Sequence, residues 1–342
     1  MIKLIEQSFS TKIEKILFDF GVKTKSVNKV TKNNFEIYDI ELGSGIKFSK
    51  VERILPEIGL GLKSKSIPRG YPVLNKGVYR IEVQTKDFST SKLEDYFLEF
   101  KDKYCPIVIG SNSSGEKIVS DLMDFPNMLV AGATGSGKSV VLHNIILSLI
   151  KNGSEIYLVD PKMVEFSCYE DLSSIKECSY SAEESVDLIN RLNEKMNSRF
   201  SLLKSSKSRN MVEHNKKTGD SMRPIVMVVD EWADLFMQDK TIESPLCKLA
   251  QKGRAAGISI VLATQRPSVK VISGLIKANF LGRISMRVSN SVDSRIVLDR
   301  NGAEKLKEVG TGIFINRKQE VSVFKSPFVE DISKFLEDKI DI

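Results

Sequence analysis

The chain has 342 residues, of which 41% are hydrophobic and 28% charged. This composition is typical of a globular protein of about two domains and excludes a mainly disordered or fibrous chain. Its net charge of +7 suits a polyanionic partner, although a solvated surface explains it equally well. Four cysteines without CxxC spacing and two histidines argue against a zinc site or a disulfide framework. No apolar run approaches the ~18 residues that span a bilayer, so we expect a cytoplasmic protein with no membrane segment of its own.

The first 95 residues are predicted to form a small α+β domain. In this region, short segments with hydrophobic residues at helical spacing are followed by short segments with the alternating pattern of strands. The expected elements are a helix within 1–20, a strand at 35–43, a helix at 51–62 and a strand at 77–84. The polar, charged stretch 86–104 is a candidate connector. We therefore expect domains at 1–95 and 96–342.

Downstream of residue 105, apolar runs alternate with helical patterns. Such alternation predicts an α/β domain with a mostly parallel sheet that is covered by helices on both faces. The expected strands lie at 127–132, 156–160, 225–230, 258–264 and 282–288, with a closing hairpin at 312–316 and 320–324. The expected helices lie at 138–151 and 181–204, the second opened by a capping box of Ser181 and Glu184. The basic stretch 204–217 has no periodicity and is interpreted as a loop or a helix end.

A glycine-rich segment follows the first of these strands. It reads Gly-Ala-Thr-Gly-Ser-Gly-Lys-Ser and fits the pattern GxxxxGK[ST] between a strand and a helix. Glycines let backbone N–H groups turn toward phosphate oxygens, and the helix N-terminus adds its dipole. We therefore expect ATP binding, with Lys138 at the β- and γ-phosphates and Ser139 on Mg²⁺; the alternative is a chance glycine turn. The expected nucleotide-binding residues are Gly132, Ala133, Thr134, Gly135, Ser136, Gly137, Lys138 and Ser139.

Polar side chains also follow two later strands. Asp230 and Glu231 come directly after IVMVV, and an acidic residue at the carboxyl end of a neighbouring parallel strand faces the phosphate crevice. We expect Asp230 to orient the Mg²⁺ shell through water and Glu231 to polarise the attacking water. The alternative is a pair of helix N-cap residues. Thr264 and Gln265 end the strand after that, where Gln265 either senses the γ-phosphate or only caps the strand.

Several segments resemble the motor of the FtsK/SpoIIIE DNA translocases over about 120–320. They read MLVAGATGSGKSVVLHNIILSL, VDPKMVEFSCYEDL, IVMVVDEWADLFM, LAQKGRAAGISIVLATQRPSVKVISGLIKAN and SNSVDSRIVLDRNGAEKL. Residues 35–84 resemble the smaller domain that precedes this motor. The resemblance implies a RecA-like ATPase that forms a hexameric ring and pumps double-stranded DNA through its centre.

The resemblance also implies roles for four basic residues. The segment QKGRAAGI matches the arginine-finger region of the family, so Arg254 is the candidate that reaches the ATP of a neighbouring subunit. Family loops that contact DNA phosphates correspond here to Arg266, Lys277 and Arg295. Without the resemblance, each of these residues is more simply explained as a solvated surface residue or an ion-pair partner.

The sequence departs from the family pattern in ways that bear on its role. Ser291 stands where a family lysine precedes the DSR segment, with Arg287 nearby, and Trp232 replaces a phenylalanine. The DNA-reading winged-helix module and the N-terminal membrane segments of the cell-division members are not found. We therefore expect a compact form suited to a phage, plasmid or other mobile element. Two alternatives stay open: an ATPase that drives protein export, and a non-catalytic ring that binds nucleic acid.

Overall fold

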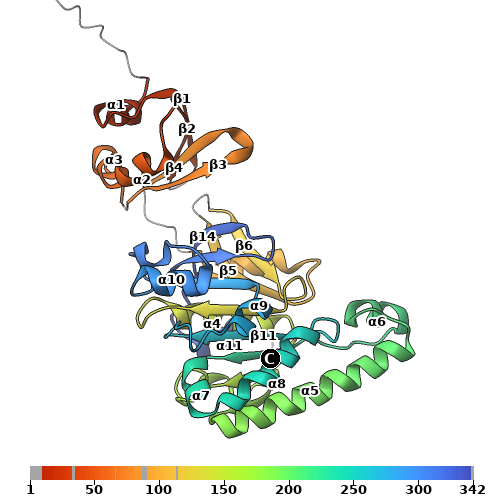
Figure 1. The fold of residues 1–342 in the computed structure, drawn as a ribbon. Coiled ribbons are helices and arrows are strands. Elements are labelled where there is room, and N and C mark those ends of the chain that lie inside the picture. The colour runs from red at the N-terminus through yellow and green to blue at the C-terminus, as the bar shows by residue number, and fades with distance from the viewer. Residues whose placement is uncertain (1–9, 33–34, 66, 86–90, 113–114, 340–342) are drawn as a thin grey trace, which may run out of the picture. The chain divides into compact units, whose positions relative to one another are not determined.

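The computed structural model describes residues 10–339 apart from 33–34, 66, 86–90 and 113–114. The chain forms two compact units, one made of residues 1–89 with 113–116 and the other of residues 90–112 with 117–342 (Figure 1). Within the described residues, no helix combines the length and the apolar character that crossing a bilayer requires.

In its described residues, the first unit is a four-stranded antiparallel sheet with three α-helices and one short 3-10 helix. In chain order its elements are α1 (Lys12–Asp19), β1 (Thr24–Lys32), β2 (Phe35–Leu42), α2 (Phe48–Arg53), α3 (Leu55–Leu62), β3 (Arg69–Val73), η1 (Leu74–Lys76) and β4 (Val78–Gln84). The strand order is β1-β2-β4-β3. Alternate side chains of β4, namely Tyr79, Ile81 and Val83, face a core that also contains Ile13 and Leu17 of α1.

The local predictions for this unit hold in part. Thr11 and Glu14 form a capping box at the start of α1, whereas positions 1–9 of the expected opening helix lie outside the described residues. The single helix expected at 51–62 is wrong: two short helices meet at Ile54, and Pro56 in the first turn of α3 suits a helix start. Strands β1 and β3 escaped prediction because they are the edges of the sheet and expose much of their surface.

The second unit is built on a ten-stranded sheet. In spatial order its strands are β6 (Lys117–Asp121), β5 (Pro106–Asn112), β14 (Val321–Lys325), β13 (Thr311–Ile315), β12 (Gly282–Met286), β7 (Asn127–Ala131), β11 (Ile258–Thr264), β10 (Ile225–Val229), β8 (Glu155–Val159) and β9 (Ile175–Ser179). In this spatial order, each strand between β6 and β12 pairs antiparallel with the next. From β12 through β7, β11, β10 and β8 to β9, neighbouring strands pair in parallel. The predicted α/β class with a mostly parallel sheet and a closing hairpin is confirmed.

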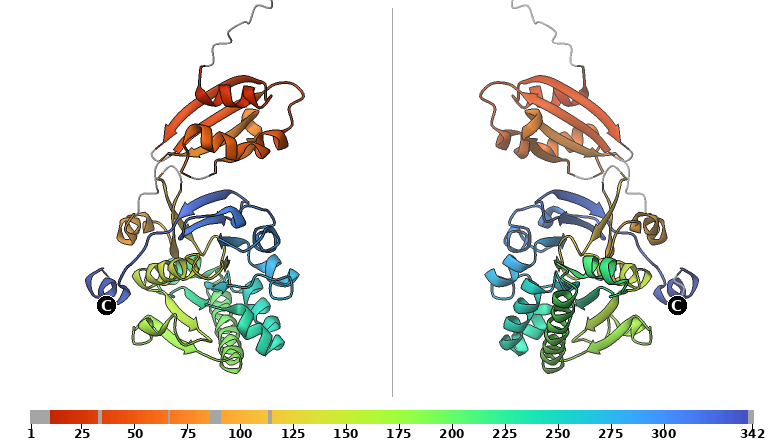
Figure 2. Two further views of the ribbon diagram at one scale, coloured as in Figure 1. Left: turned by 90° about the vertical axis from the view of Figure 1, so that its left-hand side faces the viewer. Right: turned by 90° about the vertical axis from the view of Figure 1, so that its right-hand side faces the viewer.

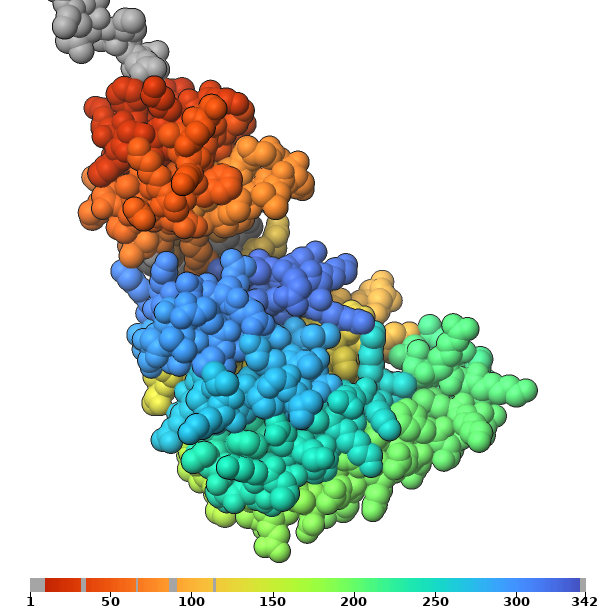
Figure 3. Space-filling view, viewed as in Figure 1, coloured from red at the N-terminus to blue at the C-terminus, as the bar shows by residue number. Residues whose placement is uncertain are grey.

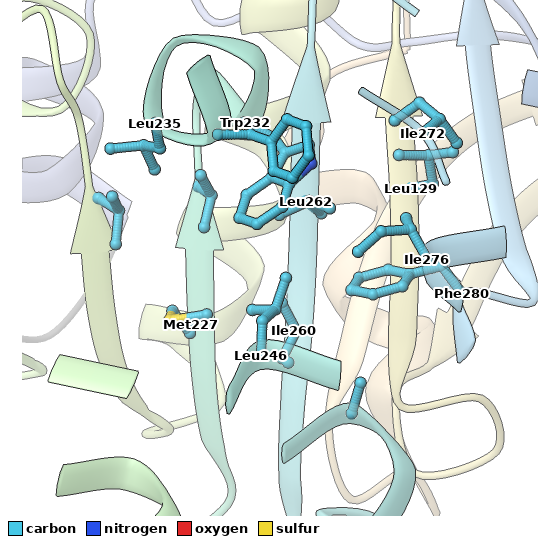
Figure 4. Close-up of a cluster of buried hydrophobic side chains, with 14 of the residues drawn as sticks. Leu129, Met227, Trp232, Leu235, Leu246, Ile260, Leu262, Ile272, Ile276 and Phe280 are labelled. Atoms are coloured by element: carbon cyan, nitrogen blue, oxygen red, sulfur yellow. The ribbon is translucent and has the colours of Figure 1, made fainter. Parts of the chain in front are cut away.

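Helices cover both faces of this sheet (Figure 2). They are η2 (Leu93–Phe100), α4 (Lys138–Lys151), η3 (Ser167–Tyr169), α5 (Ala182–Ser205), α6 (Met211–Thr218), α7 (Trp232–Gln238), η4 (Lys240–Ile242), α8 (Glu243–Lys252), α9 (Gly274–Asn279), α10 (Ser291–Leu298), η5 (Ala303–Lys305) and α11 (Ile332–Lys339). One face packs on α5 and on α7 to α10, and the other on α4, η2 and α11. Figure 4 shows the first of these cores, where side chains of β7, β10 and β11 meet α7, α8 and α9.

The helix α6 corrects the interpretation of 204–217 as a loop or helix end. It follows the long helix α5 (Figure 1), and its residues lie in the green lobe at the right of Figure 3. Its N-cap Asn210 accepts a hydrogen bond from the Glu213 N–H at 2.9 Å. Only Met211 and His214 of this helix are buried, so its sequence has no apolar stripe from which periodicity could reveal it.

Candidate active site

The glycine-rich loop joins the carboxyl end of β7 to the start of α4. Gly135 and Gly137 have φ values of 71° and 99°, a region that side chains with a Cβ rarely adopt. A Cβ on Gly137 would also lie 2.7 Å from the Gly310 nitrogen. A Cβ on Gly132 would lie 2.7 Å from Cβ of Met286. Backbone conformation and close packing together explain glycine at these positions.

Neighbouring strands clamp this loop through its backbone. The Ala133 N–H donates to the Arg287 carbonyl at 2.8 Å, just beyond β12. The Ser136 carbonyl accepts from the Gly310 N–H at 2.9 Å, just before β13. The Ser136 hydroxyl is buried and has no hydrogen-bond partner among the described residues. A buried hydroxyl without a partner is costly, so this observation fits a loop built around a polar ligand such as phosphate.

Lys138 reaches from the first turn of α4 to the end of β10. Its Nζ donates to the Asp230 carbonyl oxygen at 2.8 Å and forms an ion pair with the Asp230 carboxylate. Both side chains are only 4% exposed. The expectation that the Asp230 strand directly neighbours the loop strand is wrong, because β11 lies between β7 and β10. The long lysine side chain makes the connection across that gap.

Glu231 is fixed by the end of the intervening strand β11. Its carboxylate accepts hydrogen bonds from the Thr264 hydroxyl at 2.6 Å and from the Gln265 N–H at 2.9 Å. The Gln265 amide oxygen in turn accepts from the Thr134 hydroxyl of the glycine-rich loop at 2.9 Å. A continuous chain of hydrogen bonds therefore joins the loop to the buried Glu231.

The residue after Glu231 anchors this carboxylate in the core. Trp232 is buried in the hydrophobic core of Figure 4, and its indole N–H donates to the Val271 carbonyl at 2.9 Å. Helix α7 begins at Trp232, so Glu231 serves as its N-cap and bonds the Ala233 N–H at 3.4 Å. Glu231 therefore acts as a helix N-cap, as the alternative interpretation expected, and its carboxylate still accepts the hydrogen bond from Thr264.

A further carboxylate near the site was not predicted. The pKa of Glu165 lies below its usual value chiefly because its carboxylate interacts with His143, although burial opposes the effect. The His143 Nε2 lies 3.2 Å from the Glu165 Oε1. The available signal was the segment DPKMVEF directly after β8, but nothing in its spacing places Glu165 beside His143.

Arg254 lies at the opposite edge of the sheet. It follows α8 and precedes β11, whose far end carries Thr264. Its side chain is exposed, and its Nε donates to the Met123 carbonyl at 3.2 Å. A strand rises ~3.3 Å per residue, so the seven residues of β11 place Arg254 about 20 Å from the Thr264 end. The structure therefore does not bring Arg254 to the site of its own chain.

The three residues expected to contact DNA lie on separate elements. Arg266 follows β11 and is exposed. Lys277 of α9 forms an ion pair with Asp299 at 2.5 Å. Arg295 of α10 is exposed and donates to the Asn301 Oδ1 at 3.1 Å. Within the described residues, no hydrogen bond joins these three side chains to one another.

A loop with the phosphate-binding pattern joins a strand to a helix, and carboxylates stand at the ends of parallel strands. This arrangement defines a RecA-like P-loop ATPase fold. The chain belongs to the FtsK/SpoIIIE family, whose model matches residues 98–269. Fold and family are those of an ATPase.

The relatives agree with this assignment. A DNA translocase FtsK of Clostridium tetani is 38% identical over an alignment of 322 positions that covers 89% of this chain and 43% of the relative. The chain thus spans less than half the length of the curated relatives it matches. The structure of the pCW3 conjugation coupling protein TcpA, solved as a monomer with ATPgS, has a TM-score of 0.71 at 27% identity and covers 95% of this chain and 98% of its own. The type VII secretion ATPase EccC of Thermomonospora curvata, with a TM-score of 0.62 at 22% identity over 71% of this chain and 32% of its own, shows the fold alone.

Proposed function

We propose that this protein is an ATP-driven translocase of double-stranded DNA that assembles as a hexameric ring and moves DNA through its central pore. One observation carries the proposal: the hydrogen-bonded chain from Thr134 through Gln265 to the buried Glu231. It links the loop that would hold phosphate to the carboxylate that would act on water. The FtsK relatives are named as DNA translocases, which supports DNA as the substrate that is moved. In this proposal residues 1–95 form the accessory module and residues 96–342 the motor.

The phosphate groups of ATP are bound by the backbone N–H groups of 132–137 and by the N-terminus of α4. Lys138 neutralises charge at the β- and γ-phosphates. Ser139 and Asp230 are the residues that hold Mg²⁺, directly or through water, since hydroxyl and carboxylate oxygens are the donors that this ion prefers. When bound, Mg²⁺ offsets the negative charge that builds up on the transferred phosphoryl group.

Glu231 is the residue that acts on the attacking water. Its carboxylate is buried, which strengthens its electrostatic effect, and two donors from the end of β11 orient it. Gln265 contacts both the loop, through its side chain, and Glu231, through its backbone. Loss of the γ-phosphate would therefore be felt at Gln265 and passed to the exposed Arg266 that follows it.

Arg254 completes the site of a neighbouring subunit rather than its own. Its position at the far edge of the sheet supports this assignment, because no side chain spans about 20 Å. A guanidinium is permanently charged and presents several donors, which suits stabilisation of a γ-phosphate in transfer. Arg266, Lys277 and Arg295 then contact the phosphates of the DNA backbone.

The test measures ATP turnover with and without long double-stranded DNA, together with displacement of a third strand from a linear duplex. We expect DNA to stimulate turnover and ATP to drive displacement. Turnover that ignores DNA but rises with an unfolded export substrate would favour the protein-export alternative. DNA binding without any turnover would instead indicate a non-catalytic ring. Electron microscopy of particles with DNA tests the ring directly.

A further inference from the structure

We propose that Arg199 is a positioning residue for Arg254, the residue that reaches the ATP of a neighbouring subunit in the proposed function. Arg199 lies on α5, and its guanidinium holds the turn that carries Arg254 by its backbone. Its oxygen partners, on Ala256, Arg223 and Glu155, lie at the amino ends of β11, β10 and β8, opposite the glycine-rich loop. The inference rests on the role given to Arg254 and deepens it, and it is independent of DNA movement.

Arg254 stands in a tight turn between α8 and β11. The Gly257 N–H donates to the Arg254 carbonyl at 3.2 Å, and the Ile258 N–H donates to the Gly253 carbonyl at 2.9 Å. Gly257 has a φ of 71°, and a Cβ at this position would lie 2.4 Å from the Met211 Sδ. These contacts define the shape of the turn. Its position depends on what holds it from outside.

The buried side chain of Arg199 holds the turn from α5. It is 8% exposed, its Nη1 donates to the Ala256 carbonyl at 2.8 Å, and its Nη2 donates to the Arg223 carbonyl at 2.8 Å. A guanidinium presents its donors in a fixed planar fork, so one side chain ties the Arg254 turn to the loop before β10. Hydrogen bonds from a charged donor are roughly twice as strong as neutral ones. The Ala256 carbonyl is two residues from Arg254, so fixing it restricts where Arg254 can lie.

A second contact holds the same turn from α6. The N–H of the buried Met211, the first residue of α6, donates to the Ala255 carbonyl at 2.9 Å. Two successive carbonyls directly after Arg254 are therefore each bound by another helix. The Glu155 Oε1 lies 3.8 Å from the Arg199 Nη2 and gives the buried cation a counter-ion.

Arg254 thus combines a held backbone with a free tip. Its Nε donates to the Met123 carbonyl at 3.2 Å, but within the described residues its Nη atoms have no hydrogen-bond partner. Those atoms stay open to a phosphate of a neighbouring subunit. An arginine that acts across an interface needs this placement, because a displacement of about 1 Å can cost roughly 10²-fold in rate. Arg199 supplies part of that placement from outside the reaction site.

The first test is a double-substitution cycle on Arg199 and Arg254. Arg199→Met removes the donors and keeps an apolar side chain, and Arg191→Met is the matched control, since Arg191 is an exposed residue of α5 that pairs with Glu177. In Arg199→Met we expect turnover to fall by about 10–100-fold while affinity for a fluorescent, non-hydrolysable ATP analogue is unchanged. Adding Arg254→Ala should give turnover no lower than Arg254→Ala alone, because both substitutions act through one contact. Arg191→Met should match the wild type.

Mixed rings provide the second test. Arg199→Met keeps its own nucleotide pocket, so mixing it with Lys138→Ala, which keeps a well-placed Arg254, should raise turnover above the average of the two variants. Mixing Arg199→Met with Arg254→Ala should give no such gain, because neither chain then supplies a well-placed arginine. Should Arg199→Met fail to fold by circular dichroism, Arg199→Lys carries both tests, since an ammonium keeps the charge but not the fork.

Three outcomes overturn the inference. Losses that multiply in the double variant would make Arg199 a general support of the fold. A fall in nucleotide affinity that matches the fall in turnover, or a gain on mixing with Arg254→Ala, would place the defect in the pocket of the Arg199 variant. Full turnover in Arg254→Ala would remove the role of Arg254 and this inference with it. DNA-independent turnover with the expected non-additivity would instead refute the translocase proposal and leave this inference standing.

Discussion

Two lysine–aspartate pairs in this molecule illustrate opposite uses of the same chemistry. Lys138 and Asp230, at the carboxyl edge of the sheet, are each 4% exposed. Lys277 and Asp299, joining α9 to the end of α10, are 27% and 58% exposed. Removing one partner of a buried pair typically costs about 3–5 kcal/mol, whereas an exposed pair contributes about 0.2–1 kcal/mol and weakens with salt. The first pair is shielded from solvent, whereas the second is open to solvent and to other anions.

This difference suggests how one fold combines a fixed reaction site with a changeable contact surface. Asp299 also pairs with Arg283, which is 8% exposed and donates to the Phe280 carbonyl at 3.2 Å. Arg283 is therefore held in place from several sides. Lys277 is the more exposed cation at Asp299, and in the proposed function it exchanges this carboxylate for a DNA phosphate.

The largest expected effect is on ATP turnover, and it comes from a residue that is exposed in the single chain. Arg254 is exposed, yet we expect Arg254→Ala to bind ATP and to lose turnover by roughly 10³–10⁵-fold, because a neighbouring subunit would bury it at a reacting phosphate. Mixing Arg254→Ala with Lys138→Ala should restore measurable ATPase activity, since some interfaces then pair an intact pocket with an intact arginine. Full activity of Arg254→Ala alone would refute the role. Inactivity at every ratio, with mixed rings seen on native gels, would argue against action across the interface unless several adjacent sites must be intact.

The next largest effect tests the buried residues of the reaction site through ATP binding and turnover. Glu231→Gln should bind ATP but turn it over at least about 10²–10³-fold more slowly, because a neutral amide cannot polarise water as a carboxylate does. Lys138→Ala should lose nucleotide binding as well as turnover. Steady-state ATPase assays and equilibrium nucleotide binding separate the two variants. Near-normal turnover in Glu231→Gln would remove Glu231 from the reaction, and Glu194→Gln, at an exposed position of α5, serves as the control.

Asp299→Asn tests the exposed pair of Lys277 and Asp299 through DNA affinity and stability. The substitution frees Lys277, so DNA should bind more tightly, while the salt dependence of log affinity should stay close to that of the wild type because the same phosphate contact is made. Burial opposes ionisation of Asp299, but hydrogen bonds from Lys277 and Arg283 hold its pKa below the usual value. A depressed carboxyl pKa stabilises the fold above the unfolded pKa of about 4, and this contribution is lost as the pH falls through the folded pKa.

The unfolding free energies of wild type and Asp299→Asn should therefore differ at neutral pH and converge in acid. Urea unfolding at several pH values and DNA binding across a salt series provide the measurements. Unchanged DNA affinity in this variant would mean that Lys277 does not face the DNA.

The smallest effects concern single phosphate contacts. Lys277→Ala and Arg295→Ala should each weaken binding to all duplex sequences alike and reduce the salt slope by about one. Lys248→Ala, an exposed lysine on α8, is the matched control and should leave the slope unchanged. A strong preference for one short sequence that persists at high salt would contradict this non-specific mode of binding.

The sequence by itself determined the elements whose signals are local. The glycine-rich loop, the strands around it and the capping of α5 at Ser181 are set by neighbouring residues, and the structure has them at the expected positions. Buried parallel strands were also predictable, because both of their faces are apolar and the runs are continuous. Edge strands such as β1 and β9, and the helix α6, carry weaker signals because they bury less of their surface.

Only the tertiary structure decided which polar groups meet. Lys138 and Asp230 are 92 residues apart in sequence, and Thr134 and Gln265 are 131 apart, so no local pattern specifies either contact. The insertion of β11 between β7 and β10, the placement of Glu165 beside His143 and the pairing of Lys277 with Asp299 likewise arise from packing of distant segments. The sequence supplies the chemical groups. Which of them meet depends on the order of the strands, and burial of apolar surface drives the packing that sets this order.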